Sequence, residues 1–323
     1  MRVALAFSAQ RDDPDTDLHA AVAHLAQALT RLGHAALPVP LGLDVAAFWQ
    51  ALQTAQPDVI WNLCEEASGR PGRELHAAAL LELQDVPVTG TAAAELALCL
   101  DKALARVLLA AAGATVPQAV RVAAGQAVPL AVPLPAIVKP TSQDGSAGID
   151  AQSVVHTHAQ AQAAVARLHA QGLGDALVEA FIAGRELNAL LLGPPGGPIA
   201  ALALGEIDFS QVPPAQPRIL TWAAKWQEDS AEFLTTPVRY PAVVDPELLV
   251  KIRELADRAF AALGLAGYAR LDLRVDAAGE PFLIDVNPNP DLSPDAGLVR
   301  ALPALGLSFD DFVALQLGWA RIK

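Results

Sequence analysis

Two short segments near the end of the chain, residues 268–275 and 281–288, constrain the fold more than any other feature. Each alternates apolar and polar residues as a half-buried β-strand does, and the Ala-Ala-Gly-Glu between them is typical of a tight turn. The pattern therefore predicts a β-hairpin. Because strand side chains alternate between the two faces of a sheet, four polar residues should share one face: Arg270, Asp272, Asp285 and Asn287.

This polar face suits a Mg²⁺ ion bound to phosphate, because that ion prefers the oxygen atoms of carboxylates and similar groups. It therefore points to nucleotide-dependent chemistry. The alternative is an exposed sheet face that carries a solvated charge pair. Judged by residue types alone, that alternative is the more common arrangement.

Two upstream segments favour a nucleotide-binding site over an exposed sheet face. Residues 134–140 predict an apolar strand that ends near Lys139, and residues 141–148 form a small loop containing glycine. Backbone amides in such a loop can approach phosphate oxygens, and the lysine adds a point charge. Another apolar strand leads to two acids, Glu179 and Glu186, which suit the amine and hydroxyl edges of a nucleoside. The chain has no Walker A motif, and each segment alone is weak, but the three in this order indicate a nucleotide site.

The first part of the chain alternates strands and helices. We expect strands at residues 2–7, 35–39 and 58–63, and helices at 18–32, 44–55 and 73–83. This order predicts a parallel sheet covered by helices, with ligands bound at the carboxyl ends of its strands. The loop that begins with Cys64 and Glu65 lies at such an end. Further helices are expected at residues 101–112, 157–171, 246–263 and 309–322.

Composition narrows the class of protein. A chain of 323 residues suits two or three packed lobes, and a hydrophobic content of 53% supports ample cores. No apolar run reaches the ~18 residues that a membrane span needs, and the first residues predict a strand, not a signal peptide. Two cysteines, Cys64 and Cys99, give no disulfide framework and favour a cytoplasmic location. A net charge of −13 argues against nucleic acid as a partner.

Together these segments resemble an ATP-grasp ligase, and within that group the chain is most similar to D-alanine:D-alanine ligase and its relatives. The matching motifs span nearly the whole length: residues 89–91, 100–102, 137–140, 178–186, 270–272 and 284–287. The resemblance implies an α/β ATP-grasp fold with an N-terminal parallel-sheet domain (1–95), a central lobe (96–182) and a C-terminal lobe (183–323) carrying the metal and acceptor sites. By analogy of fold it also implies a homodimer.

The reaction implied by the resemblance joins a small-molecule carboxylate to an amine, with ATP and Mg²⁺ as cofactors. Two Mg²⁺ ions are expected, and Mn²⁺ should be able to substitute. The carboxylate attacks the γ-phosphate to give ADP and an acyl phosphate, and the amine then displaces phosphate to form an amide or peptide bond. An amino acid is the expected donor. Such catalysis depends mainly on positioning and charge stabilisation.

The resemblance implies roles for the nucleotide-binding residues. Glu179 would face the adenine amino group, the backbone of Phe181 and Ile182 would meet the ring, and Glu186 would bind the ribose hydroxyls. The phosphates would be bound by three lysines: Lys102, Lys139 and Lys225. For Lys102 the alternative is an ordinary residue on a helix surface.

The resemblance also implies the metal-binding and catalytic residues. Asp272, Asp285 and Asn287 would hold Mg²⁺. Arg270 would stabilise charge on the tetrahedral intermediate, and a structural salt bridge with a neighbouring acid is the main alternative for it. The other residues expected at the reacting groups are Lys225 and Ser146.

Several positions depart from the family pattern, and all bear on the substrates. The family's first-loop glutamate has no clear counterpart, although Asp15 or Asp17 could replace it. A histidine-glycine pair is replaced by Cys64 and Glu65, and a lysine-tyrosine pair by Lys225 and Trp226. One metal ligand is Asp285 in place of the usual glutamate. Where the acceptor's carboxylate would lie, the chain has Asp291 and Asp295, which favour a less negative or a positively charged acceptor.

Three interpretations follow. The favoured one is an ATP-grasp amino-acid or peptide ligase whose specificity has diverged from D-Ala–D-Ala. The second is a genuine D-alanine:D-alanine ligase of cell-wall synthesis, against which the departures count. The third is a catalytically inactive nucleotide-binding scaffold or sensor. Retention of both metal acids together with Lys139 and Arg270 argues against the third.

Overall fold

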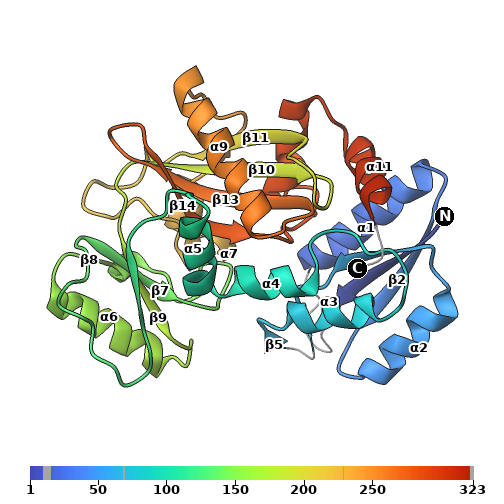
Figure 1. The fold of residues 1–323 in the computed structure, drawn as a ribbon, viewed down its shortest axis with the longest axis horizontal. Coiled ribbons are helices and arrows are strands. Elements are labelled where there is room, and N and C mark those ends of the chain that lie inside the picture. The colour runs from blue at the N-terminus through green and yellow to red at the C-terminus, as the bar shows by residue number, and fades with distance from the viewer. Residues whose placement is uncertain (10–15, 68–69, 228, 321–323) are drawn as a thin grey trace.

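The computed structural model describes residues 1–9, 16–67, 70–227 and 229–320. Three principal sheets follow one another along the chain and lie side by side (Figure 1). The first contains β1 (Arg2–Ser8), β2 (Ala35–Leu41) and β3 (Val59–Leu63), paired in parallel in the order β2-β1-β3. The predicted parallel sheet is therefore confirmed.

Helices cover both faces of this first sheet: α1 (Thr16–Arg31), α2 (Val45–Ala55) and α3 (Glu74–Glu82). The central strand β1 is almost entirely apolar because it is buried on both sides. Val3 and Leu5 pack in one core with α1, whereas Ala4 and Ala6 pack in another with Phe48 of α2. A short hairpin of β4 (Glu66–Ala67) and β5 (Arg70–Pro71) follows the carboxyl end of β3.

Two helices, α4 (Ala93–Leu100) and α5 (Lys102–Ala111), lead to the second sheet. The sequence predicted only the second of them, because Ala92 offers α4 no side-chain cap. The second sheet is antiparallel in the order β6-β9-β7-β8. Its strands are β6 (Ala119–Val122), β7 (Ala136–Pro140), β8 (Val154–Val155) and β9 (Ala176–Ala180). After the short η1 (Ala151–Ser153) and β8, α6 (His158–Ala170) packs against this sheet.

The third sheet is antiparallel in the order β12-β11-β10-β13-β14. Its strands are β10 (Arg185–Gly193), β11 (Ala201–Ile207), β12 (Val238–Arg239), β13 (Gly267–Val275) and β14 (Pro281–Asn287). Two short helices, α7 (Trp222–Trp226) and α8 (Ala231–Thr235), lie in the connection from β11 to β12. The long helix α9 (Pro246–Ala262) crosses one face of the sheet (Figure 1) and packs there together with α5.

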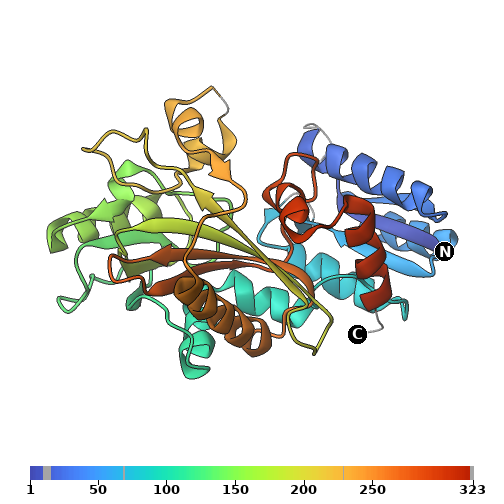
Figure 2. The same ribbon diagram turned by 90° about the horizontal axis from the view of Figure 1, so that it is seen from above.

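The last part of the chain returns to the first sheet through α10 (Gly297–Ala301), η2 (Leu302–Leu305) and α11 (Phe309–Trp319). Figure 2 shows α11 beside α1, and Phe312 of α11 is fully buried in the same core as Trp61 of β3. An ion pair of 2.6 Å between Arg31 and Asp310 also joins the two helices. None of the helices in the described ranges combines the length and apolar character that crossing a bilayer requires.

Candidate active site

A cleft of about 730 Å³ lies between the second and third sheets, beside α5 and α7. It is lined mainly by apolar side chains and by charged residues that come from opposite walls. Most of the residues predicted from the sequence line it: Lys102, Lys139, Ser146, Glu179, Phe181, Ile182, Glu186, Lys225, Asp272 and Asp285. The structure therefore brings together residues that lie up to 183 positions apart in the chain.

The predicted hairpin forms from β13 and β14, and its register brings the four polar residues together. Arg270 lies opposite Asn287 and Asp272 lies opposite Asp285, so all four share one face of the sheet. The register then shifts, because Ile284 forms a bulge between Asp285 and Leu283. The carbonyl oxygen of Ile284 accepts a hydrogen bond of 3.0 Å from Lys139 Nζ of the second sheet. The bulge thus links the two walls of the cleft.

Asp272 is held by two neighbours on its own sheet. Arg270 donates to both carboxylate oxygens, at 2.8 and 3.1 Å, and the side-chain amide of Asn188 on β10 donates to one of them at 2.7 Å. Asn188 lies directly opposite Asp272 in the sheet. The salt bridge weighed as an alternative for Arg270 is therefore present, although the same arginine remains on the polar face of the sheet.

Asp285 pairs with Lys102, whose Nζ lies 2.8 Å away. Burial would raise the pKa of Asp285, but the nearby ammonium groups of Lys102 and Lys139 outweigh it and lower this pKa to about 2. The carboxylate is therefore ionised over the whole physiological range. Together with Asp272 and the amide of Asn287, it forms a set of oxygen donors that fits Mg²⁺, which proteins usually bind through one or two carboxylates plus substrate phosphates.

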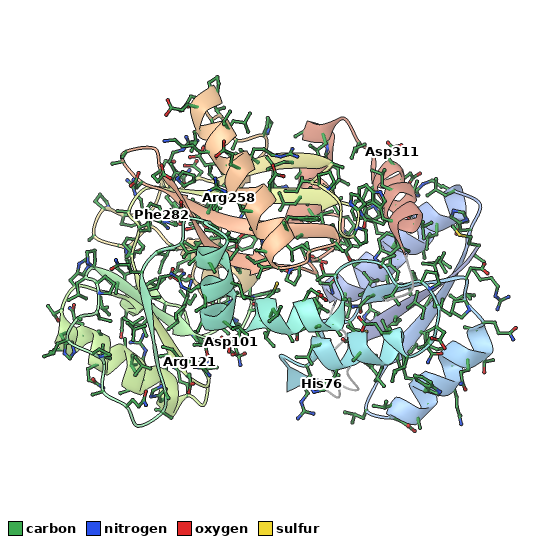
Figure 3. All side chains as sticks on the ribbon, in the orientation of Figure 1. His76, Asp101, Arg121, Arg258, Phe282 and Asp311 are labelled. Atoms are coloured by element: carbon green, nitrogen blue, oxygen red, sulfur yellow. The ribbon has the colours of Figure 1, made fainter. Side chains whose placement is uncertain are left out.

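Lys102 is placed by the start of α5. Asp101 caps this helix by accepting hydrogen bonds from Ala103 N and Leu104 N, both at 3.0 Å, and Arg121 of β6 pairs with Asp101 at 3.2 Å (Figure 3). Lys102 Nζ also lies 3.1 Å from Asp144 in the glycine-containing loop. Burial alone would lower the pKa of Lys102, but the charges of Asp285 and Asp144 outweigh this effect and raise the pKa above its usual value. The side chain is therefore a fixed cation. It is buried in the cleft wall and is no ordinary surface residue.

Glu179 is fully buried on β9 between two cations. Arg106 donates to it at 2.7 Å and Lys139 at 3.2 Å. Arg106 follows Lys102 by one helical turn on α5, so both side chains face the cleft wall. The sequence analysis did not identify Arg106, although its spacing from Lys102 was a usable signal.

The segment between β9 and β10 presents backbone groups to the cleft. Phe181 N donates to Pro135 O at 2.9 Å, and Ile182 O accepts from Arg274 Nε at 2.9 Å. Within the described residues, the Phe181 carbonyl and the Ile182 amide have no hydrogen-bond partner. One acceptor and one donor are thus left adjacent beside the apolar lining of the cleft. Glu186, the next predicted residue, is buried and pairs with Arg274 at 2.6 Å.

The α7 segment closes one side of the cleft. Trp226 donates from Nε1 to the Gly145 carbonyl at 2.8 Å, and Trp222 N donates to Ile149 O at 3.0 Å. Both contacts join α7 to the loop after β7, which also contains Ser146. Between these contacts Lys225 points into the cleft, where burial and then the charge of Arg270 lower its pKa.

The residues expected at the substrates are more dispersed. Glu65 and Asp291 line a second, much smaller cavity beside α1 that is open to solvent, and both lie near the hydroxyl of the buried Tyr268. Asp295 is exposed. Asp15 lies outside the described residues, and of Asp17 only its place in α1 is described.

Cys64 does not qualify as a nucleophile. It is fully buried beside the second cavity, and burial raises the pKa of its thiol to about 12. The second cysteine, Cys99, is likewise buried and free.

Comparisons with known proteins agree with this geometry. A family model described as "D-ala D-ala ligase C-terminus" matches residues 116–317. The D-alanine–D-alanine ligase of Gluconobacter oxydans is 31% identical over 88% of each chain. The protein y4sG of Sinorhizobium fredii is also 31% identical, over 79% of this chain and 72% of its own length.

Two solved structures share the fold. The D-alanine–D-alanine ligase of Bacillus anthracis complexed with ATP aligns with a TM-score of 0.74 at 16% identity, covering 98% of this chain and 96% of its own. The VanG D-Ala:D-Ser ligase of Enterococcus faecalis aligns with a TM-score of 0.71 at 18% identity, covering 99% of both chains. The expected ATP-grasp fold is thereby confirmed. This chain belongs to the D-alanine–D-alanine ligase family of ATP-grasp enzymes, which form carbon–nitrogen bonds.

Proposed function

We propose that this protein uses ATP to join a carboxylate to an amine through an acyl phosphate. The observation that carries the proposal is the convergence of opposite charges in one cleft. Lysines from α5 and β7 meet the acids of β13 and β14, with Lys102 Nζ lying 2.8 Å from Asp285 and Lys139 Nζ lying 3.0 Å from Ile284 O. Such a set can hold a triphosphate and a divalent ion together.

The nucleoside would lie against the segment that joins β9 to β10. The Phe181 carbonyl and the Ile182 amide supply one acceptor and one donor, which match the amino group and the neighbouring ring nitrogen of adenine. The Glu186 carboxylate would accept from the ribose hydroxyls. Phosphates would then extend toward Lys102, Lys139 and Lys225.

The proposed metal ligands are Asp272, Asp285 and Asn287. When bound, Mg²⁺ would neutralise phosphate oxygens and so favour attack by an anionic donor. Because Arg270 and Asn188 already hold Asp272 from two sides, its carboxylate is oriented before any ligand arrives.

The chemistry itself would proceed in two displacements. A carboxylate oxygen of the donor attacks the γ-phosphorus, the bond to the bridging oxygen breaks, and ADP leaves with that electron pair. The amine of the second substrate then attacks the acyl carbon, loses a proton, and expels phosphate. Lys225 would stabilise charge on the transferred phosphoryl group, Arg270 would do so on the tetrahedral oxyanion, and Ser146 would contact the reacting groups from the loop after β7.

The second cavity supports a diverged specificity. Glu65 and Asp291 lend it negative charge, which disfavours a substrate carboxylate there and favours a positively charged group. The main alternative is a genuine D-alanine–D-alanine ligase, the activity named for the Gluconobacter oxydans relative.

Phosphate release with Mg-ATP tests the proposal across a matrix of L- and D-amino acids and simple amines, with products identified by mass. We expect release only when a carboxylate and an amine are both present, and most strongly when one substrate carries a second positive charge. Release with D-alanine alone, giving the dipeptide, would instead support the alternative. If the protein binds ATP but releases no phosphate with any pair, and an Asp272→Asn variant binds Mg-ATP as well as the wild type does, an inactive scaffold would be favoured.

A further inference from the structure

Arg274 is a buried arginine on the cleft face of β13, two residues beyond Asp272 and four beyond Arg270. Because strand side chains alternate between the two faces, Arg270, Asp272 and Arg274 all lie on the same face of the sheet. Arg274 lies directly opposite Glu186 in the neighbouring strand β10. Arg274 as a whole is only 3% exposed. Arginine is rarely buried to this extent unless its guanidinium is paired with other groups.

The hydrogen bonds of this guanidinium reach three separate segments of the cleft wall. Nη1 donates to Glu186 Oε2 at 2.6 Å and to Arg218 O at 2.7 Å. Nε donates to Ile182 O at 2.9 Å, and Nη2 approaches Gly184 O at 3.4 Å. The charge also lies 5.0 Å from the centre of the Phe181 ring. One side chain therefore fixes the connection between the second and third sheets, the carboxylate of Glu186, and the connection that leads to α7.

Gly184 reinforces the same attachment. It adopts a φ of +147°, and a Cβ built on it would lie 1.9 Å from the Val275 carbonyl of β13. The backbone of the connection thus approaches β13 more closely than any other residue type would allow. Gly184 and Arg274 together hold residues 181–184 against the third sheet.

We propose that Arg274 is a positioning residue for the nucleoside. It orients the Glu186 carboxylate toward the ribose and sets the backbone of Phe181 and Ile182 at the depth that adenine requires. A neutral residue at this position would leave Glu186 buried without a counter-charge and would release the connection from β13. This inference rests on the proposed function, because it assumes that an adenine nucleotide occupies the cleft.

The test compares the binding of ADP and 2′-deoxyADP by calorimetry, which needs no turnover. The wild type should bind ADP about tenfold or more tightly than 2′-deoxyADP, the factor expected for a hydrogen bond to a charged group. In Arg274→Met the affinity for ADP should fall by at least this factor, and the ratio of the ADP affinity to the 2′-deoxyADP affinity should approach one. Glu186→Gln should also lower the ratio, and the double variant should lose little more, because the two residues act as a unit.

Two further variants make the result specific. Arg253 on α9 also donates to a backbone carbonyl, Ile199 O at 2.6 Å, and to the carboxylate of Asp257, but it lies away from the cleft. The Arg253→Met variant should therefore bind both nucleotides as the wild type does. Arg274→Lys keeps the charge but cannot hold all these acceptors, so it should fold and still bind ADP about fivefold or more weakly.

The outcomes separate the two proposals. The inference about Arg274 is overturned if Arg274→Met keeps the wild-type affinity for ADP and the wild-type ratio of the ADP and 2′-deoxyADP affinities. If the methionine variant does not fold, the same criterion applies to Arg274→Lys. If the wild type binds neither nucleotide, the proposed function fails. Steady-state kinetics should agree, with a raised KM for ATP and a kcat close to that of the wild type at saturating ATP.

Discussion

Lys102 Nζ lies 2.8 Å from Asp285 Oδ1, and this contact joins the start of α5 to the end of β14. The same ammonium reaches Asp144 at 3.1 Å in the loop after β7. One lysine thus connects a proposed phosphate-binding loop with a proposed metal ligand. Its neighbours also determine how the site responds to pH.

Asp285 should make the folded protein sensitive to acid. Its pKa is lowered from 3.8 to about 2, so its contribution to stability is complete above about pH 4 and is lost as the pH falls toward 2. In Lys102→Met this pKa should rise, because burial then acts with less opposition. The ionised carboxylate then contributes less stability, so thermal unfolding, followed by circular dichroism, should show a lower melting temperature at neutral pH and a weaker loss of stability between about pH 4 and pH 2 than in the wild type.

A surface lysine provides the control for that experiment. Lys251 pairs with Glu247 at 3.6 Å and Glu280 at 3.4 Å, both on the surface, where ion pairs contribute little. Lys251→Met should therefore leave the acid profile unchanged. An identical shift in both variants would mean that the contact between Lys102 and Asp285 has no special influence.

Replacing Gly184 should destabilise the fold. In Gly184→Ala the new Cβ would overlap the Val275 carbonyl, which lies 1.9 Å from its position, and the expected cost is about 3 kcal/mol or more. Gly174 also has a positive φ, +81°, but no atom within 4 Å of a Cβ, so Gly174→Ala should cost only about 1–2 kcal/mol. Urea unfolding measures both values, and equal losses would count against the close approach at Gly184.

The contact between Trp226 and Gly145 should contribute to nucleotide binding. Trp226→Phe keeps an aromatic ring but removes the donor to Gly145 O, so the KM for ATP should rise about fivefold, as expected for one hydrogen bond of about 1 kcal/mol. Trp222 is the matched control, because its contact to the loop is made by its backbone. Trp222→Phe should leave the KM for ATP within about twofold of the wild-type value. Similar effects of the two substitutions would contradict a specific contribution of the contact between Trp226 and Gly145.

The acids of the second cavity should govern substrate choice. Glu65→Gln and Asp291→Asn should each lower kcat/KM for positively charged substrates by about tenfold, the scale of one charged contact, while sparing neutral ones. Asp295→Asn tests the remaining predicted acid, which does not line this cavity, and should change kcat/KM for neither kind of substrate. Competition assays between a cationic and a neutral substrate measure this directly. An unchanged preference in both cavity variants would refute the expected charge of the substrate.

Much of the fold could be predicted from local patterns. Alternation over residues 268–288 predicted the hairpin and the shared face of Asp272 and Asp285, because their positions follow from strand periodicity alone. Helix α4 was missed because it begins at Ala93 without a side-chain cap, so its start has no local signal.

The partners within the site were harder to predict. The sequence analysis did not identify Arg274, although this residue follows the same alternation as Asp272. Its role depends on Glu186 and Ile182, which come from a distant part of the chain. The bulge at Ile284 depends on tertiary contacts and has no signal in the sequence. The divisions at residues 95/96 and 182/183, the homodimer and the cytoplasmic location stay predictions.

Oxygen transfer tests the central claim most directly. If the donor carboxylate is labelled with ¹⁸O and incubated with Mg-ATP and an accepted amine, mass spectrometry of the released phosphate should find one ¹⁸O atom per product formed. That label can reach phosphate only if the carboxylate oxygen bonded to phosphorus, as in an acyl phosphate. Amide formation that releases unlabelled phosphate would contradict the account.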